Sequence, residues 1–243
     1  MFTLFKKELN SFFSSLIGYL VISIFLIANG LFLWVFPGGY NILDNGYATL
    51  EPLFYFAPWI FLFLIPAVSM RMFSDERNSG TIELLFTKPI SEYQIILAKY
   101  LAALSLVIFS LLPILIYYIS VWYLANPVGN IDVGAFWGSF IGLFFLAAVY
   151  VAIGIFSSSL TKNQIVAFII SLALSYFIYI GFDSIAYLSW FKGIENFISS
   201  LGISEHYRSI SRGVIDSRDV VYFLSVITVF VSLTKMKLES RKY

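Results

Sequence analysis

The sequence predicts an all-α polytopic membrane protein with six transmembrane helices. The chain of 243 residues is 60% hydrophobic and only 12% charged, with a mean hydropathy of +0.88. Soluble globular chains are nearer about 45–50% apolar and about 25% charged. A helix of about 20 apolar residues crosses a bilayer core of about 30 Å. In lipid a single spanning segment must be helical, because only a helix satisfies all backbone hydrogen bonds within the segment. Six runs reach or approach that length: Leu16–Phe36, Pro52–Met70, Tyr100–Ala125, Ala135–Leu160, Ile165–Leu188 and, shortest, Val220–Thr234.

Residues 1–15 predict an amphipathic helix lying in the inner membrane interface. Apolar side chains recur there at helical spacing, and Lys6, Lys7 and Glu8 fall largely on the other side. This helix is either a simple anchor or a lever between a cytoplasmic partner and the first span. The run that follows is longer than a signal-peptide core and no small-residue cleavage pattern ends it, so we interpret it as a retained span.

Positive charges are concentrated in alternate loops. Lys and Arg precede the first run, separate the second from the third and the fourth from the fifth, and follow the sixth, whereas Pro37–Glu51 and Asn126–Gly134 contain none. The positive-inside rule therefore places both termini in the cytoplasm. Tryptophan, which prefers the headgroup level, agrees with this orientation at four predicted outer ends: Trp34, Trp122, Trp137 and Trp190. The exceptions are cations of the outer segment: Lys192, Arg208, Arg212 and Arg218.

The densest polar stretch, within residues 72–99, lies between the second and third runs. The second span is expected to end near Arg71, followed by the turn-rich connector Ser74–Gly80. Thr81 is expected to cap a short apolar helix that Pro89 terminates, since the residue before proline avoids helix. Ser91 and Gln94 then form a capping box for the helix that enters the third span. Lys99 is counted with the loop cations, and no run has Lys or Arg in its interior.

A short helix that is apolar on nearly all sides is not expected to remain exposed to water. One interpretation is that it docks in a groove on another protein, with Asp75, Glu76, Arg77 and Lys88 as a charged rim. The alternative is an ordinary interfacial loop whose charges are solvated.

The spacing of residues in this stretch resembles a known family. The pattern Glu76-x-x-x-Gly80-Thr81-x-Glu83-Leu84-Leu85-x-Thr87-x-Pro89-Ile90-Ser91, followed by Lys99, is similar to the segment between spans two and three of ABC-2 type transporter permeases. Ser209–Phe223 resembles that family's outer segment before the last span. The resemblance covers essentially the whole chain, 1–243, as a single domain, and extends to the gliding-motility-associated permeases of gliding bacteria.

The resemblance carries expectations about partners. In this family the short helix is a coupling helix that docks on a separate ATPase subunit, which implies the same for Thr81–Thr87, with Glu76 and Glu83 as polar anchors. It also implies a second permease copy or a paralogue, ATP and Mg held by the ATPase, and a bacterial inner (cytoplasmic) membrane location. The implied coupling residues are Glu76, Gly80, Thr81, Glu83, Leu84, Leu85, Thr87 and Pro89.

The sequence lacks the residues that nucleotide binding, metal binding and thiol chemistry need. No G-x-x-x-x-G-K-[ST] pattern occurs, so we expect no nucleotide site in the chain. Cysteine is absent, the one histidine, His206, cannot form a usual metal site and is expected to be a surface residue, and a net charge of +1 does not favour a nucleic-acid partner. We expect a non-enzymatic membrane subunit whose other contacts are with lipid.

The spans contain packing and bending signals. Gly138 and Gly142 allow a close helix contact, expected within the chain rather than at a dimer seam. Pro58, Pro66 and Pro113 are expected to kink their helices. Asp183, the acidic residue nearest to a span interior, is expected to reach the outer interface and be solvated.

The outer segment 188–219 is apolar in its first half and polar in its second. We expect the first half to dip into the outer leaflet and the second to lie on the surface. It is either an outer gate, with Arg208, Arg212 and Gly213 as candidates, or a cap with no gating role.

The function favoured by these observations is that of a permease subunit of an ABC exporter, driven by a separate ATPase and linked to gliding motility or envelope export. A non-transporting scaffold of a motility or envelope complex shares the same topology and is the alternative. An intramembrane enzyme ranks last, because the runs contain no paired catalytic residues at matching depth.

Overall fold

The computed structural model describes the whole chain apart from residues 88, 189, 191–192 and 241–243. The expected Lys88, Lys192, Arg241 and Lys242 therefore lie outside the described residues. In the described part, every regular element is helical, and six stretches are long and apolar enough to cross a membrane, which confirms the predicted fold class.

Three of the six stretches are much longer than a hydrocarbon core of about 30 Å requires. Glu51–Asn78 and Val133–Leu160 each have 28 residues and Glu92–Leu124 has 33, or roughly 42, 42 and 50 Å at 1.5 Å per residue. The last, expected to be short, runs for 23 residues because polar residues extend it at both ends. The stretches comprise α2 (Leu16–Gly30) with η1 (Leu31–Val35), α4 (Glu51–Ser69) with α5 (Arg71–Asn78), α7 (Glu92–Leu111) with α8 (Ile114–Leu124), α9 (Val133–Leu160), α10 (Gln164–Tyr176) with η2 (Phe177–Gly181) and α11 (Phe182–Ala186), and α14 (Ser217–Glu239).

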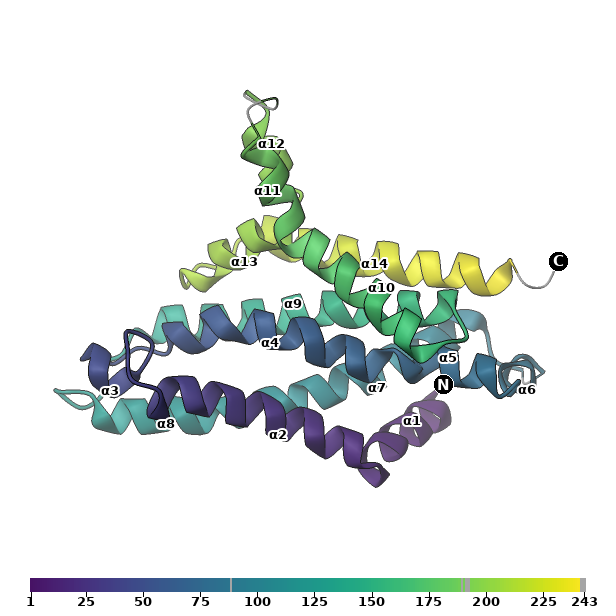
Figure 1. Ribbon diagram of the computed structural model, residues 1–243, viewed down its shortest axis with the longest axis horizontal. Helices are drawn as coiled ribbons and strands as arrows, with labels where there is room; N and C mark the ends of the chain where they lie inside the picture. The colour runs from purple at the N-terminus through teal and green to yellow at the C-terminus, as the bar shows by residue number, and fades with distance from the viewer. Residues whose placement is uncertain (88, 189, 191–192, 241–243) are drawn as a thin grey trace.

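Helix α9 is the centre of the bundle. It packs against α4, α7, α10, α13 and α14, and 72% of its most apolar stretch is buried, against 22% for Gln164–Ala186. Gly154 permits the closest approach, since a β-carbon there would lie 1.9 Å from the hydroxyl of Ser69 on α4. The long helices run side by side, with α10 crossing obliquely (Figure 1).

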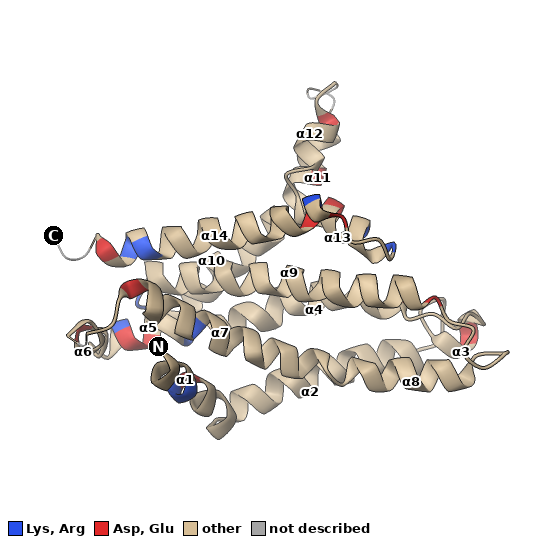
Figure 2. Cartoon of the chain, turned by 180° about the vertical axis from the view of Figure 1, so that it is seen from behind, with Lys and Arg blue, Asp and Glu red and all other residues tan. Residues whose placement is uncertain are grey.

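The two ends of the bundle are distinct. Both termini, α1 (Phe2–Ser14), α5 and the short α6 (Ile82–Phe86) lie at one end, and α3 (Ile42–Asn45) lies at the other (Figure 1). Charged residues gather at these ends and around α11–α13, leaving the middle of the bundle helices uncharged (Figure 2). This distribution is typical of helices whose centres lie in hydrocarbon.

The long helices are interrupted at two places, of which only Pro113 is an expected bend, and α4 runs through Pro58 and Pro66 without a break. Between α4 and α5 the helix is interrupted at Met70, where the Ser158 hydroxyl of α9 accepts from the N–H groups of Phe73 and Ser74 at 2.9 and 3.0 Å and donates to the Met70 carbonyl at 2.7 Å. Between α7 and α8 the break falls at Pro113. An inserted side chain and a proline are both established causes of helix kinks.

The segment between the fifth and sixth spans contains two short helices that pack differently. Helix α12 (Glu195–Ser199) projects away from the bundle (Figure 1). Helix α13 (Ile203–Ser211) is amphipathic and folds back, burying Ile203, Tyr207 and Ile210 against the bundle.

The α9 glycines make that inward packing possible. A β-carbon at Gly138 would lie 2.3 Å from the carbonyl oxygen of Ile210, and one at Gly142 would lie 3.2 Å from the Tyr207 ring. A β-carbon at Gly213, which adopts φ +89°, would lie 2.7 Å from the carbonyl carbon of Gly134 at the start of α9. These glycines thus mediate contact between α9 and α13 within one chain.

Two outer polar residues were expected at the surface and lie instead in hydrogen-bonded clusters. Asp183 accepts from Ser204 at 2.5 Å and from the Arg208 guanidinium at 3.1 Å, with its side chain only 17% exposed. The ring of His206, 15% exposed, lies 2.6 Å from Asp219 through Nδ1 and stacks on Tyr222. Asp183 meets its partners because α13 lies beside α11, and His206 meets Asp219 because α13 lies beside α14, neither of which sequence order shows.

Candidate functional site

The charged end of the bundle carries the polar stretch singled out in the sequence. The expected turn-rich connector is wrong: residues 71–78 continue as helix α5, and the turn is confined to Ser79 and Gly80. Gly80 adopts φ +73°, the left-handed conformation that commonly ends helices and suits glycine. The turn reverses the chain immediately before α6.

The short helix α6 forms where predicted, between this turn and Pro89. Backbone bonds from Leu85 to Thr81 and from Thr87 to Glu83 close it. Thr81 does not cap it through its side chain, because its hydroxyl lies 2.9 Å from that of Ser79 instead. The hydroxyl of Thr87 donates a hydrogen bond to the Leu84 carbonyl at 3.0 Å.

Helix α6 and the residues that flank it, 81–87 and 89, form a stub with an inner and an outer side. Ile82 is buried, and Leu85 and Phe86 are partly buried against the core. Leu84, by contrast, is 65% exposed. The other residues exposed around it are Thr81, Glu83, Thr87 and Pro89. The stub therefore presents one large apolar side chain within a polar rim, rather than being buried on all sides.

The helix after the stub starts at the predicted place. Ser91 accepts from the Gln94 N–H, and the Gln94 side chain accepts from the Ser91 N–H, which confirms the capping box. The bonds are 3.4 and 3.3 Å long. They satisfy two otherwise unpaired donors at the start of α7.

A buried ion cluster ties the stub's supporting helices to the N-terminal helix. The Lys99 ammonium, on a side chain only 1% exposed, lies 3.0 Å from Glu8 of α1 and 2.9 Å from Glu76 of α5. It also lies 5.2 Å from the centre of the Phe73 ring. Lys99 is therefore not a loop cation: it lies within α7 and joins three helices.

The cluster has a second, solvent-exposed cation. Lys7 lies 3.1 Å from Glu8 and 3.5 Å from Glu76. Partial burial lowers the pKa of Lys7, but the two carboxylates outweigh it and raise the pKa above its usual value. The formal charges of two lysines and two glutamates cancel, as a largely buried cluster requires.

This cluster changes the interpretation of Glu76. Its side chain is 13% exposed and its Oε1 atom contacts Lys99 and Lys7. Of the two expected polar anchors, Glu83 is on the exposed side of the stub and Glu76 is turned into the bundle. Sequence reasoning missed the link because Glu8 and Lys99 are 91 positions apart; the one signal was a lysine embedded in a long apolar helix.

Polar contacts also tie α5 to the central helix. Arg77 donates to the carbonyl of Ser159 at the end of α9, and Gln164 at the start of α10 donates to Asp75. Together with Ser158 at the Met70 kink, these bonds hold α5 on the side opposite the ion cluster. The stub is thus an exposed protrusion on a helix linked to α1, α7, α9 and α10.

A comparison with protein-family models decides which family this is. The model described as "ABC-2 family transporter protein" matches residues 6–236, nearly the whole chain. The chain belongs to the ABC-2 transporter family. A search of curated proteins found no match.

As an ABC-2 permease, the chain is a transmembrane subunit without a nucleotide-binding domain, and permeases of this kind function with ABC ATPase partners. ATP and its metal ion are therefore held outside this subunit. Among the described residues, no group of three or more His, Cys, Asp or Glu side chains could hold a metal ion.

Proposed function

We propose that this ABC-2 permease is the export channel subunit of an ABC transporter and that α6 is its docking element for a separate ATPase subunit. The observation that carries the proposal is the exposure of Leu84, flanked by exposed Glu83 and Thr87, on a stub whose Ile82 is anchored in the core. An apolar core within a polar rim is the usual arrangement of a protein–protein interface. Gly80, Thr81, Leu85 and Pro89 shape the stub.

The links around α5 suggest how docking produces movement. Closure of the ATPases on ATP pushes α6, and α5 transmits the displacement through Lys99 to α1 and α7, and through Arg77 to α9. The interruptions at Met70 and Pro113 let α4 and α8 tilt relative to the segments nearer the ATPase. The N-terminal helix is then a lever as well as an anchor.

The wider setting is also a proposal. Charge asymmetry in the loops supports cytoplasmic placement of both termini and of α6. Family resemblance supports a bacterial inner-membrane location, a working unit of two permeases and two ATPases, and a role in gliding motility or envelope export. Arg208, Arg212 and Gly213 remain candidates for an outer gate on α13 and the turn after it.

The docking proposal is tested by recovery of the ATPase with tagged permease purified in detergent. Leu84→Asp should abolish recovery, because a carboxylate cannot enter an apolar pocket without a partner. The matched control is Leu43→Asp, since Leu43 is 63% exposed at the opposite end of the bundle. Equal ATPase recovery with both variants would contradict docking through α6, and recovery of none with the wild type would favour the scaffold alternative.

A further inference from the structure

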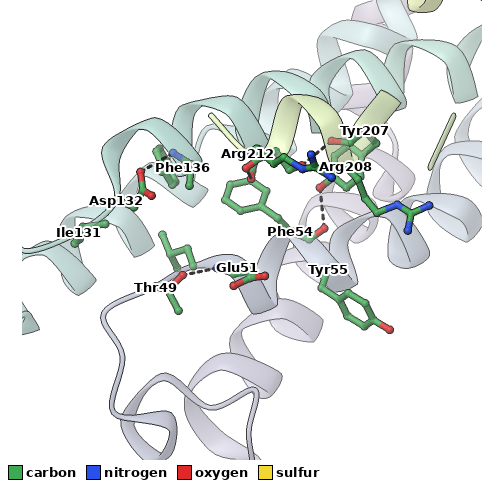
Figure 3. Close-up of a pocket in the computed structure, with 14 residues that line it drawn as sticks. Thr49, Glu51, Phe54, Tyr55, Ile131, Asp132, Phe136, Tyr207, Arg208 and Arg212 are labelled. Carbon is green, nitrogen blue, oxygen red and sulfur yellow. Dashed lines mark hydrogen bonds between the residues drawn. The ribbon is translucent and has the colours of Figure 1, made fainter. Parts of the chain in front are cut away.

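The end of the bundle opposite α6 contains a cavity of about 540 Å³. Its walls are the start of α4, the start of α9 and one side of α13 (Figure 3). This volume is within the roughly 300–1,000 Å³ of typical small-molecule sites.

The cavity is divided by charge. Glu51 and Asp132 contribute carboxylates from α4 and from the cap of α9, whereas Arg212, the residue after α13, lies on the other side, and Arg208 of α13 extends away from these carboxylates (Figure 3). Arg208 is already neutralised by Asp183 at 3.1 Å. No ion pair or side-chain hydrogen bond of Arg212, and none of the Glu51 carboxylate, occurs within the described part of the chain. Two opposite charges therefore line one cavity without pairing with each other.

The remaining lining is mainly apolar and includes several aromatic side chains. Phe54 and Phe136 form buried walls, and the ring of Tyr207 completes them, its hydroxyl donating to the Phe54 carbonyl at 2.7 Å. Burial raises the pKa of the Tyr207 phenol well above its usual value, so this donor stays protonated. A ligand of this cavity needs an anionic group, a cationic group and an apolar portion.

The position of the cavity indicates where such a ligand comes from. Phe136 is followed by Trp137, which is 43% exposed, and Trp122 of α8 is 37% exposed near the same end. Exposed tryptophan marks the headgroup level of a bilayer. Lipid headgroups are thus the most concentrated charged molecules beside the cavity.

We propose that this cavity binds the phosphate–ammonium headgroup of a zwitterionic phospholipid of the ethanolamine type. Arg212 holds the phosphate, since guanidinium matches phosphate geometry. Glu51 and Asp132 face the ammonium, and the acyl chains follow the aromatic wall. The site lies at the opposite end from α6 and does not depend on ATPase docking, so either proposal can fail without the other.

The test is native mass spectrometry of the full chain in detergent with added dioleoyl phosphatidylethanolamine or phosphatidylglycerol, which lacks the ammonium. The wild type should retain phosphatidylethanolamine preferentially. Arg212→Ala should weaken binding of both lipids roughly tenfold, about 1.4 kcal/mol. Glu51→Gln should reduce the preference for phosphatidylethanolamine, since only the Asp132 carboxylate then remains, while leaving phosphatidylglycerol bound.

The controls are Arg218→Ala and Glu195→Gln, which change exposed charges outside the cavity. Circular dichroism and gel filtration establish that the variants fold. Displacement of the lipid by soluble phosphoethanolamine would show that the headgroup alone is recognised, and no displacement would identify the intact lipid as the ligand. Lipid binding by Arg212→Ala equal to that of Arg218→Ala, or a preference for phosphatidylethanolamine that Glu51→Gln leaves unchanged, would overturn the proposal.

Discussion

Removal of the buried lysine should destabilise the permease more than removal of any surface cation. In Lys99→Met the ammonium that lies 3.0 Å from Glu8 and 2.9 Å from Glu76 is lost, leaving two carboxylates that are 11% and 13% exposed. Breaking a buried ion pair by deleting one partner costs about 3–5 kcal/mol. Lys7 remains beside both carboxylates, so we expect the lower end, about 3 kcal/mol. For a chain of this size, about 2–4 °C per kcal/mol converts this to a fall in Tm of roughly 6–12 °C.

The assay is thermal unfolding of purified protein in detergent, followed by intrinsic fluorescence. The control is Lys235→Met, which removes a half-exposed lysine paired with Glu239 at 3.2 Å and should cost at most about 1 kcal/mol. Combining Lys99→Met with Glu8→Gln and Glu76→Gln should recover most of the loss, because no unpaired charge then remains buried. A Tm for Lys99→Met equal to that of Lys235→Met would refute the reasoning.

Two further substitutions test the contacts of the central helix by the same thermal assay. Gly154→Ala places a methyl group 1.9 Å from the Ser69 hydroxyl and should lower the free energy of unfolding by about 1–3 kcal/mol, a loss that Ser69→Ala should partly restore. The control Gly39→Ala, where no heavy atom lies within 4 Å of the added methyl group, should be nearly neutral. Equal effects of Gly154→Ala and Gly39→Ala would contradict the close α4–α9 contact. Ser158→Ala leaves two N–H groups at the start of α5 without their acceptor and should cost about 1–3 kcal/mol. Ser120→Ala, which removes an exposed hydroxyl bonded within its own helix, serves as its control, and an equal loss in the two would refute the role of Ser158 at the kink.

The features that the sequence predicts correctly at this end of the bundle depend on contacts between residues close together in the chain. The stub, its end at Pro89 and the capping box of Ser91 were predictable, because the determining contacts are within four residues along the chain. The extension of α5 through Asn78 was missed, because polar residues that are typical of turns are held helical by contacts with α9 and α10. Tertiary contacts override weak local propensity in this way.

The outer segment shows the same division. Its mixed composition correctly indicated a part of the chain outside the six spans, but not which half returns to the bundle. That was decided by α13, whose apolar side fits the small residues Gly138 and Gly142 of α9. Asp183 and His206, which the sequence predicts at the surface, lie in hydrogen-bonded clusters because α13 packs beside α11 and α14.

The sequence by itself determined that this protein crosses a membrane six times as helices, because transfer of long apolar runs into lipid depends on composition and length alone. It also determined the location of the short helix between the second and third spans. Only the tertiary structure decided that Lys99 joins three helices, that Glu76 points inward while Leu84 points outward, and that opposite charges share one cavity at the end of the bundle opposite α6. Those arrangements depend on contacts between packed helices that are far apart in the chain. The order of residues along the sequence does not specify such contacts directly.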